Sequence, residues 1–308
     1  MTTAATATPG AAAPAEIFSV EIFPPKTDQG VERLARELTQ LASLAPAYVS
    51  VTSAAGSEAS DRTRRTVAWV RERLGADADL APHLVAVGAT RPTVRATLAS
   101  YRALGIRHLV VVRGDVPGGA PPIAGEFPHA ADLIAFIRAE TGDAFHIEAA
   151  AHPEFHPEAP SAEGDLAHFA RKVAAGVDSA VTQYFYNADA YFSFVESCAR
   201  RGLALPIVPG IMPIVGYERL VRFSAAAGVE IPRWLRRRLD ELVSQPEALV
   251  AFGVDMVSRL CAQLLAGGAP GLHFYTMNRA EPTSTLWIRL GLGRARPPRT
   301  GAAGQLAR

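Results

Sequence analysis

Residues 108–115 read His108-Leu-Val-Val-Val-Arg-Gly-Asp115, so four consecutive apolar residues lead directly into an arginine, a glycine and an aspartate. A continuous apolar run rich in β-branched residues is typical of a strand that is buried on both faces, as in a parallel sheet. Parallel strands need crossover connections, which are usually helices. The stretch therefore predicts an α/β protein in which the same strand pattern recurs between helices.

The pattern recurs along the chain. Strands are predicted at residues 18–23, 47–52, 82–87, 108–113, 146–151, 179–183, 206–211 and 271–275. Stretches of helical period lie between them, at residues 30–44, 61–74, 93–104, 130–140, 165–175 and 190–201, and the seventh gap has room for helices at 217–227, 232–242 and 246–265. Eight β–α units in about 280 residues predict a (β/α)8 TIM-type barrel.

An open doubly wound sheet is the alternative fold. It usually carries a glycine-rich turn after its first strand. Here Phe23 is followed by Pro24-Pro25-Lys26, and the pattern GxGxxG is absent from the sequence. We therefore expect a single barrel domain over residues 16–292, with disordered tails at residues 1–15 and 293–308.

The composition excludes several classes of protein. Lysine and arginine number 31 against 30 aspartates and glutamates, and 49% of the residues are hydrophobic, so the chain is neither disordered as a whole nor basic enough for nucleic acid. Cys198 and Cys261 cannot form a disulfide framework and are expected to be buried apolar residues. Without a signal peptide or an apolar run of about 18 residues, we expect a cytoplasmic protein that does not bind membranes.

Polar residues at the carboxyl ends of the strands are the candidates for a site, because that end of a barrel carries the active site. They include Glu21, Thr52, Arg113, Gly114, Asp115, His152, His156, Gln183 and Arg279. Asp115 also precedes Pro117-Gly118-Gly119, a loop flexible enough to close on a ligand.

Glu21 lies in the middle of the first strand between apolar residues. By alternation it shares a face with Ser19 and Phe23, so its side chain is expected to point into the barrel mouth. Burial there would raise the pKa of the carboxyl group and make it a proton donor near neutral pH. The alternative is a structural carboxylate paired with an arginine such as Arg279.

Two further motifs have both a structural and a functional interpretation. His152-Pro-Glu-Phe-His156 resembles a metal-ligand cluster, but Pro153 and Pro157 prevent the helix that would align its histidines, so we expect a rigid loop that contacts an anionic or aromatic ligand and no metal. The residues Asp165, His168, Arg171 and Lys172 share one side of a predicted helix. They form either a salt-bridged surface or contacts to phosphate groups.

The motifs taken together resemble the methylenetetrahydrofolate reductases, in the short bacterial form that consists of the catalytic barrel alone. The matching stretches occur in order between residue 17 and about residue 292. They are Val20-Glu-Ile-Phe-Pro-Pro-Lys26, Tyr48-Val-Ser-Val-Thr52, Pro82-His-Leu84, Gly105-Ile-Arg-His-Leu109, Arg113-Gly-Asp115, His152-Pro-Glu-Phe-His-Pro-Glu-Ala159, Arg171-Lys-Val173, Thr182-Gln-Tyr-Phe185, Pro209-Gly-Ile-Met-Pro213 and His273-Phe-Tyr-Thr-Met-Asn-Arg-Ala280.

The resemblance implies a flavoenzyme in which NAD(P)H, with NADH favoured, reduces bound FAD, and the hydride passes to 5,10-methylenetetrahydrofolate. The product, 5-methyltetrahydrofolate, feeds methionine synthesis, and members are often homo-oligomers. Glu21 matches the general acid and Asp115 the acid beside flavin and pterin, while Gln183, Phe223 and Arg279 match the folate and nicotinamide pocket. Flavin contacts are implied for Thr52, His83, Arg113, Gly114, Asp115, Ala130, His152, His156, Asp165, His168, Arg171 and Lys172.

The chain departs from the family pattern at a few positions. Ser53-Ala54-Ala55 follows Thr52, His152 and His168 replace a tyrosine and an asparagine, and Val177 replaces a small residue whose loss is expected to crowd the packing behind the flavin. Two other functions stay open: a methyltransferase barrel that binds a pterin, and a non-catalytic homologue that acts as a partner subunit. The presence of Glu21, Asp115 and Gln183 argues against the latter.

Overall fold

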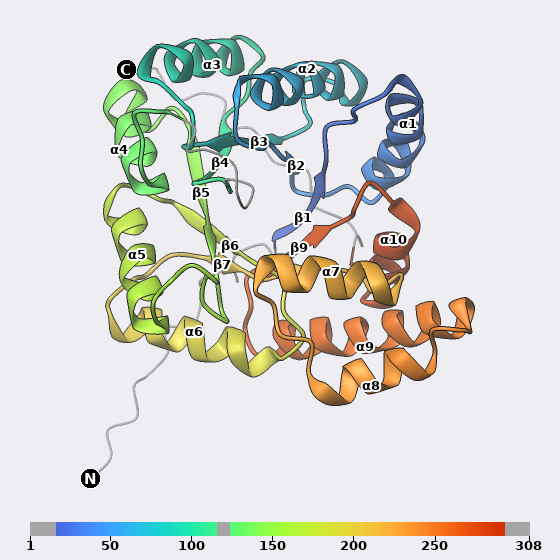
Figure 1. Ribbon diagram of the computed structural model, residues 1–308. Helices are drawn as coiled ribbons and strands as arrows, with labels where there is room; N and C mark the ends of the chain where they lie inside the picture. Colours follow the sequence, from blue (N-terminus) through green and yellow to red (C-terminus); the bar gives the residue numbers. More distant parts are fainter. Residues whose placement is uncertain (1–16, 116–123, 293–308) are drawn as a thin grey trace, which may run out of the picture.

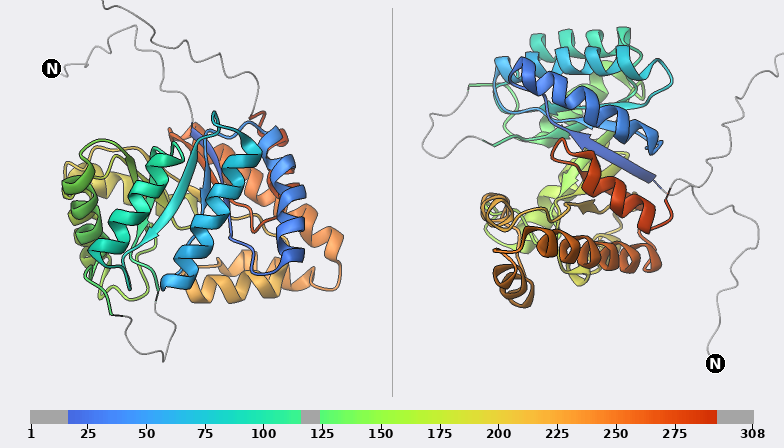
Figure 2. Two further views of the ribbon diagram at one scale, coloured as in Figure 1. Left: turned by 90° about the horizontal axis from the view of Figure 1, so that it is seen from above. Right: turned by 90° about the vertical axis from the view of Figure 1, so that its right-hand side faces the viewer.

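A computed structural model describes residues 17–115 and 124–292 of the chain. The predicted tails and the Pro117-Gly118-Gly119 loop lie outside the described residues. Within them, helices surround a central set of parallel strands (Figure 1), and two further views show the helices packed around the outside of these strands (Figure 2). The prediction of a TIM-type barrel is confirmed.

The strands of the described residues are all parallel. They are β1 Ile17–Ile22, β2 Val49–Val51, β3 Leu80–Val85, β4 His108–Val112, β5 His146–Ala151, β6 Ser179–Thr182, β7 Ile207–Val208, β8 Gly210–Ile211 and β9 Gly271–Tyr275. The helices are α1 Asp28–Ser43, α2 Ser57–Leu74, α3 Arg91–Ala103, α4 Ala130–Thr141, α5 Ala162–Ala174, α6 Ala188–Arg200, α7 Tyr217–Ala227, α8 Arg233–Glu241, α9 Pro246–Ala266 and α10 Ala280–Arg289.

The strand predicted at residues 206–211 is divided into β7 and β8 at Pro209. Proline has no backbone N–H to donate to a neighbouring strand, so the ladder is interrupted there. β7 pairs with β6 and β8 pairs with β9, which gives the order β7-β6-β5-β4-β3-β2-β1-β9-β8. Because β7 and β8 are consecutive in the chain, this order closes the barrel, and the Pro209 carbonyl still accepts a bond of 3.0 Å from the His273 N–H.

Several helices begin two to four residues before the predicted start. The prediction placed each start at the beginning of the apolar helical pattern, whereas the helix begins directly after a capping residue that lies further upstream. Thr27 accepts a hydrogen bond from the Gly30 N–H at α1, and Ser161 accepts one from the Gly164 N–H at α5. Such caps satisfy N–H groups that have no partner in the first turn. These boundaries were therefore present in the sequence as capping signals.

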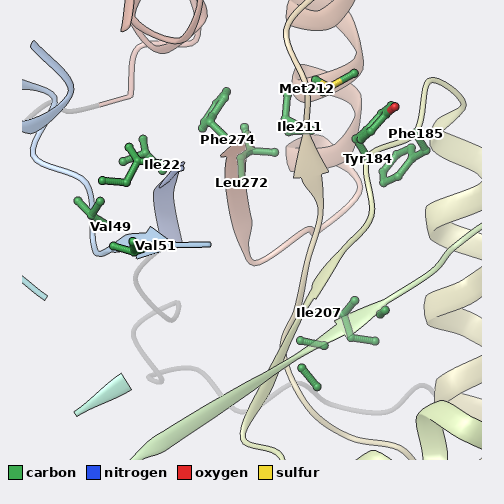
Figure 3. Packing of buried hydrophobic residues seen from close by; sticks show 14 of the residues in the cluster. Ile22, Val49, Val51, Tyr184, Phe185, Ile207, Ile211, Met212, Leu272 and Phe274 are labelled. Atoms are coloured by element: carbon green, nitrogen blue, oxygen red, sulfur yellow. The ribbon is translucent and has the colours of Figure 1, made fainter. Parts of the chain in front are cut away.

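The apolar core lies between the strands and the helices. In one part of this layer Leu272 and Phe274 of β9 lie beside Ile211 and Met212 (Figure 3), with Ile211 and Phe274 in register. Inside the barrel the buried apolar cluster is much smaller and consists of Tyr48, Ala81 and Val110. The other buried positions on the inner faces of the strands are largely polar, namely Ser19, Glu21, Ser50, His108, Glu148, Ser179 and His273.

One helix of the described part, α9, is long and apolar enough to cross a membrane by length and composition. It packs against α6 and α10 and buries Val257, Leu260 and Cys261 in the core. A buried core helix of this kind passes the same test, so the finding is weak evidence for a membrane span. Cys198 and Cys261 are both buried free thiols, as predicted.

Gly210 is required by close packing at the closure of the barrel. A Cβ atom there would lie 2.1 Å from the Thr182 carbonyl oxygen and 2.6 Å from Cε2 of Tyr275. We expect Gly210→Ala to lower the free energy of unfolding by about 1–3 kcal/mol, the usual cost of overpacking. Gly216→Ala is the matched control, because a Cβ there meets nothing within 4 Å. Urea unfolding of both variants checks this, and equal stabilities would contradict the packing.

Candidate active site

A cavity of about 530 Å³ lies beside the carboxyl ends of β4 and β5, between these strands and the helices α4 and α5. Its volume is in the range of small-molecule and cofactor sites. The lining residues are Ser53, Ala54, Ala55, Val111, Val112, Arg113, Gly114, Asp115, His129, Ala130, Ala131, Asp132, Ala150, His152, His156, Glu158, Ala159, Pro160, Asp165, His168, Arg171 and Lys172. All the expected flavin contacts except Thr52 and His83 are in this lining.

Gly114 supplies a close backbone approach at the cavity wall. Its φ is +85°, and a Cβ atom would lie 2.3 Å from Cγ1 of Val85. Only glycine fits both the backbone angle and the space. Next to it, the Arg113 guanidinium donates to the Glu158 carboxylate over 2.6 Å, so this arginine is held at the edge of the cavity.

Lys172 and Arg171 bring positive charge to the cavity from the last turns of α5. The Lys172 ammonium donates to the Ala150 carbonyl at the end of β5, and Arg171 donates to the His168 ring. Burial lowers the pKa of Lys172 to about 8, against a smaller raising effect of Asp165. Lys172 is therefore mostly charged at neutral pH, and its bond to a strand carbonyl holds it at the cavity wall. Contact of this helix with phosphate groups stays a prediction.

His152 and His156 lie together in the loop after β5, with ring centroids 4.8 Å apart. Burial, assisted by the charges of Lys172, His156 and Arg113, lowers the pKa of His152 to about 3, so this imidazole is neutral at pH 7. The Asp165 carboxylate accepts from the His156 N–H over 3.1 Å and fixes the loop to α5. In the described part of the chain, no group of three or more His, Cys, Asp or Glu side chains could hold a metal ion.

The sequence analysis missed His129 and Asp132, which line the cavity at the start of α4. The Asp132 carboxylate accepts from the His129 backbone N–H over 3.0 Å, as in a capping box. The available signal in the sequence was an acidic residue, Asp132, three positions after the helix-capping position His129. The first turn of α4 therefore faces the cavity, so the positive end of its helix dipole and the Asp132 carboxylate both lie there.

Glu21 lies inside the barrel beside two imidazoles. Its Oε2 is 3.2 Å from Nε2 of His83 on β3 and 3.7 Å from Nε2 of His273 on β9. Burial raises the pKa of the carboxyl group, but the contacts with His273 and His83 outweigh burial, and the pKa is lowered to about 2.

The expected rise in the Glu21 pKa is therefore wrong, and so is the alternative of an arginine partner. Arg279 is exposed and precedes α10. The expectation failed because it considered only burial, whereas the partners come from strands about 60 and 250 residues away in the sequence.

The remaining predicted residues lie apart from the cavity. Thr52 and His83 are outside its lining, and His83 faces Glu21. Gln183 follows β6, Phe223 is half-buried on α7, and Arg279 precedes α10, so these three come from separate elements. Val177 is two residues before β6, at the amino end of the strand, is packed against the core and is not in the lining, so the expectation that it crowds the packing behind the flavin stays a prediction.

The fold and the site define an α/β-barrel enzyme with a ligand cavity at the carboxyl ends of its strands, lined by both cationic and carboxylate side chains. The chain belongs to the methylenetetrahydrofolate reductase family, which it matches over residues 10–291. It is thus an oxidoreductase of one-carbon metabolism that reduces 5,10-methylenetetrahydrofolate. This assignment removes the methyltransferase and the non-catalytic subunit as alternatives.

Similar proteins come from bacteria and plants. A 5,10-methylenetetrahydrofolate reductase of Pectobacterium carotovorum is 38% identical, with 89% of this chain and 90% of the relative covered. A methylenetetrahydrofolate reductase (NADH) 1 of Arabidopsis thaliana is 34% identical over 89% of this chain and 48% of its own length. A solved Clostridium thermocellum protein, described as binding two copies of 5-methyl-5,6,7,8-tetrahydrofolic acid, shares the fold with a TM-score of 0.65 at 17% identity, covering 91% of this chain and 95% of that protein.

The contacts of Glu21 predict a defined loss of stability in acid. Its pKa is about 2 in the folded chain and 4.5 in the unfolded chain, so its contribution is complete above pH 4.5 and is lost as the pH falls towards 2. The contribution is at most about 3 kcal/mol. In urea unfolding between pH 2.5 and 6, Glu21→Gln should lack this part of the pH dependence. Glu32→Gln, at an exposed position of α1, should retain it, and equal slopes would contradict the ion pairs.

Proposed function

We propose that the chain reduces 5,10-methylenetetrahydrofolate to 5-methyltetrahydrofolate with NAD(P)H, NADH being favoured, through FAD bound in the cavity beside β4 and β5. The observation that carries the proposal is the make-up of the cavity. It combines a glycine wall, three cationic and four carboxylate side chains and the start of a helix, at the carboxyl end of the barrel. We further propose that the product feeds methionine synthesis and that the protein is a cytoplasmic homo-oligomer.

The residues present fit FAD, a ligand with two phosphates and a large flat ring. Arg113, Arg171 and Lys172 would neutralise the diphosphate, together with the first turn of α4. Gly114 leaves room for close approach, and the neutral His152 gives a flat, uncharged surface. Bound FAD would supply a group that accepts hydride from the nicotinamide and donates it to the folate.

The barrel mouth would bind the folate and the nicotinamide in turn. Gln183, Phe223 and Arg279 are on three elements around this mouth, and in the proposal they orient each substrate above Glu21. Asp115 follows β4 in the cavity lining, and in the proposal it positions the pterin. A shared pocket would bring either substrate to the same hydride-transfer position.

Glu21 would help to protonate the folate as its five-membered ring opens. The low pKa of Glu21 means that its carboxylate is ionised at neutral pH in the free protein. Nε2 of His273 and Nε2 of His83 lie 3.7 Å and 3.2 Å from Glu21 Oε2, and in the proposal one of these imidazoles moves into hydrogen-bond distance when folate binds and hands a proton to Glu21. The donor is therefore the Glu21–imidazole group as a unit and not a carboxylic acid that stays protonated.

Exchange of Glu21 tests this role. In Glu21→Gln we expect folate reduction to fall by about 10²–10⁴, the usual contribution of general acid catalysis, while NADH oxidation with an artificial electron acceptor is retained. Both activities are measured anaerobically on the same preparation, with Glu32→Gln as the control. Loss of both activities, or full folate reduction, would refute the assignment of Glu21 as the proton donor.

A further inference from the structure

We propose that the interior of the barrel conducts protons to Glu21 from the opposite, amino-terminal end of the barrel, along a chain of side chains that starts at His146. This inference rests on the proposed function, because it assigns a source to the proton that Glu21 delivers. In this proposal His146, Glu148, Ser179 and Tyr48 transfer protons towards Glu21 without touching the substrate.

The reaction needs such a source. Opening of the folate ring breaks the bond between the methylene carbon and N10, and N10 takes a proton. The carbon, left doubly bonded to N5, takes a hydride that derives from NAD(P)H. Each turnover therefore consumes one proton from solvent. The Glu21 side chain is only 7% exposed, and a substrate seated in the mouth would cover it further, so direct resupply from that side is blocked.

The upper part of the chain joins Glu21 to Tyr48. Nε2 of His273 is 3.7 Å from Glu21 Oε2, and Nδ1 of the same ring is 2.7 Å from Ser19 Oγ. The Tyr48 ring stacks beside the His273 ring, with centroids 5.8 Å apart, and Tyr48 and Ser19 are both buried on the inner faces of neighbouring strands. His273 thus contacts Glu21 with one ring nitrogen and Ser19 with the other, which is the arrangement that lets an imidazole pass a proton on.

The lower part joins Tyr48 to the solvent. The Tyr48 hydroxyl donates to Oε2 of Glu148 over 2.6 Å, and the Ser179 hydroxyl donates to Oε1 of the same carboxylate over 3.2 Å. Nε2 of His146 is 2.7 Å from Ser179 Oγ. His146 is the first residue of β5 and is exposed, whereas Tyr48, Glu148 and Ser179 are buried.

Each member of the chain can take a proton on one side and release one on the other. His146 takes a proton from solvent and passes it through the Ser179 hydroxyl to Glu148. When Glu148 is protonated, the Tyr48 hydroxyl rotates, accepts the proton from Glu148 and gives its own proton to Ser19. The Ser19 hydroxyl in turn gives its proton to Nδ1 of His273, and His273 releases a proton from Nε2 to Glu21. One proton enters and one leaves, so no other reactant is needed.

The environment of Glu148 favours transport over a purely structural role. A buried carboxylate is costly, and apolar residues fill the same kind of space at lower cost. Among the described residues the ion-pair contact of Glu148 is His108, whose Nε2 is 3.8 Å away. Burial, together with the charges of His146 and His273, lowers the pKa of His108 to about 3, so His108 is neutral, and the Glu148 carboxylate accepts its hydrogen bonds from the hydroxyls of Tyr48 and Ser179.

The test interrupts the chain at Tyr48 and at its entrance. Tyr48→Phe removes one hydroxyl of the proposed proton path. Tyr191→Phe is the matched control, because Tyr191 is also buried but donates to the Ile207 carbonyl, which is not part of that path. His146→Gln changes only an exposed residue. Single-turnover reduction of 5,10-methylenetetrahydrofolate by the NADH-reduced holoenzyme is followed in H2O and D2O, and NADH oxidation with an artificial acceptor is measured in parallel.

We expect Tyr48→Phe to slow folate reduction about tenfold or more and to change the solvent isotope effect, with the artificial-acceptor activity unchanged. Tyr191→Phe should behave like the unmodified protein. His146→Gln should also be slow, and added imidazole should restore its rate but not that of Tyr48→Phe, because imidazole can replace only a residue at the surface.

Two results would overturn the proposal. The first is a Tyr48→Phe variant with the unmodified rate and isotope effect. The second is a variant that loses both activities equally, since that result would assign the hydroxyl to folding. If Glu21→Gln keeps full folate reduction, the proposed function fails instead, and if Glu21→Gln is inactive while Tyr48→Phe is normal, only the proton path fails.

Discussion

Two carboxylates, Glu21 and Glu148, are buried inside the barrel, and the surrounding interior is built to satisfy them. A buried carboxylate without partners would cost several kcal/mol. His83 and His273 contact Glu21, and the hydroxyls of Tyr48 and Ser179 bind Glu148. As a result the interior of the barrel is mainly polar, and the apolar core that stabilises the fold lies outside it, between the strands and the helices.

The apolar outer layer and the polar interior of the barrel support different parts of the site. The helices α4 and α5 pack on the outer layer and bring the helix start, Arg171 and Lys172 to the cavity, while Arg113 comes from the end of β4. The inner faces of β1, β3 and β9 bring together the acid and its imidazoles. The cavity lies at the carboxyl ends of β4 and β5, and Glu21 lies near the carboxyl end of β1. In the proposed function, a ligand held in the cavity would present its reactive ring to a substrate above Glu21. We regard this as the physical basis for placing the proposed cofactor and proton donor on different layers.

Much of the fold and of the cavity could be predicted from the sequence. The apolar run at β4 and its repeats predict the barrel, and the residues after β4 and β5 and on α5, which were expected to contact one ligand, line one cavity. These features are local, since each depends on a period or a spacing within about 20 residues. Pro209 is also a local signal. Residues 206–211 nevertheless predict one strand, because the apolar run does not show that its two halves pair with different neighbouring strands.

The pKa of Glu21 and the polar chain through Tyr48 and Glu148 could not be predicted in the same way. Both depend on which inner-face residues of different strands come within a few ångströms of one another. Ser19 and His273, for example, are 254 residues apart and share a hydrogen bond of 2.7 Å. Without the register between β1 and β9, alternation indicates only that each side chain points inward.

The central claim is that a flavin in the cavity accepts hydride from a nicotinamide and passes it to the folate at the same mouth. The most direct test is the visible absorption spectrum of the purified protein, reconstituted with FAD and titrated anaerobically. We predict a flavin band that bleaches when NADH is added and returns when 5,10-methylenetetrahydrofolate follows. A protein that binds no FAD, or a band that NADH bleaches and the folate does not restore, would contradict the account.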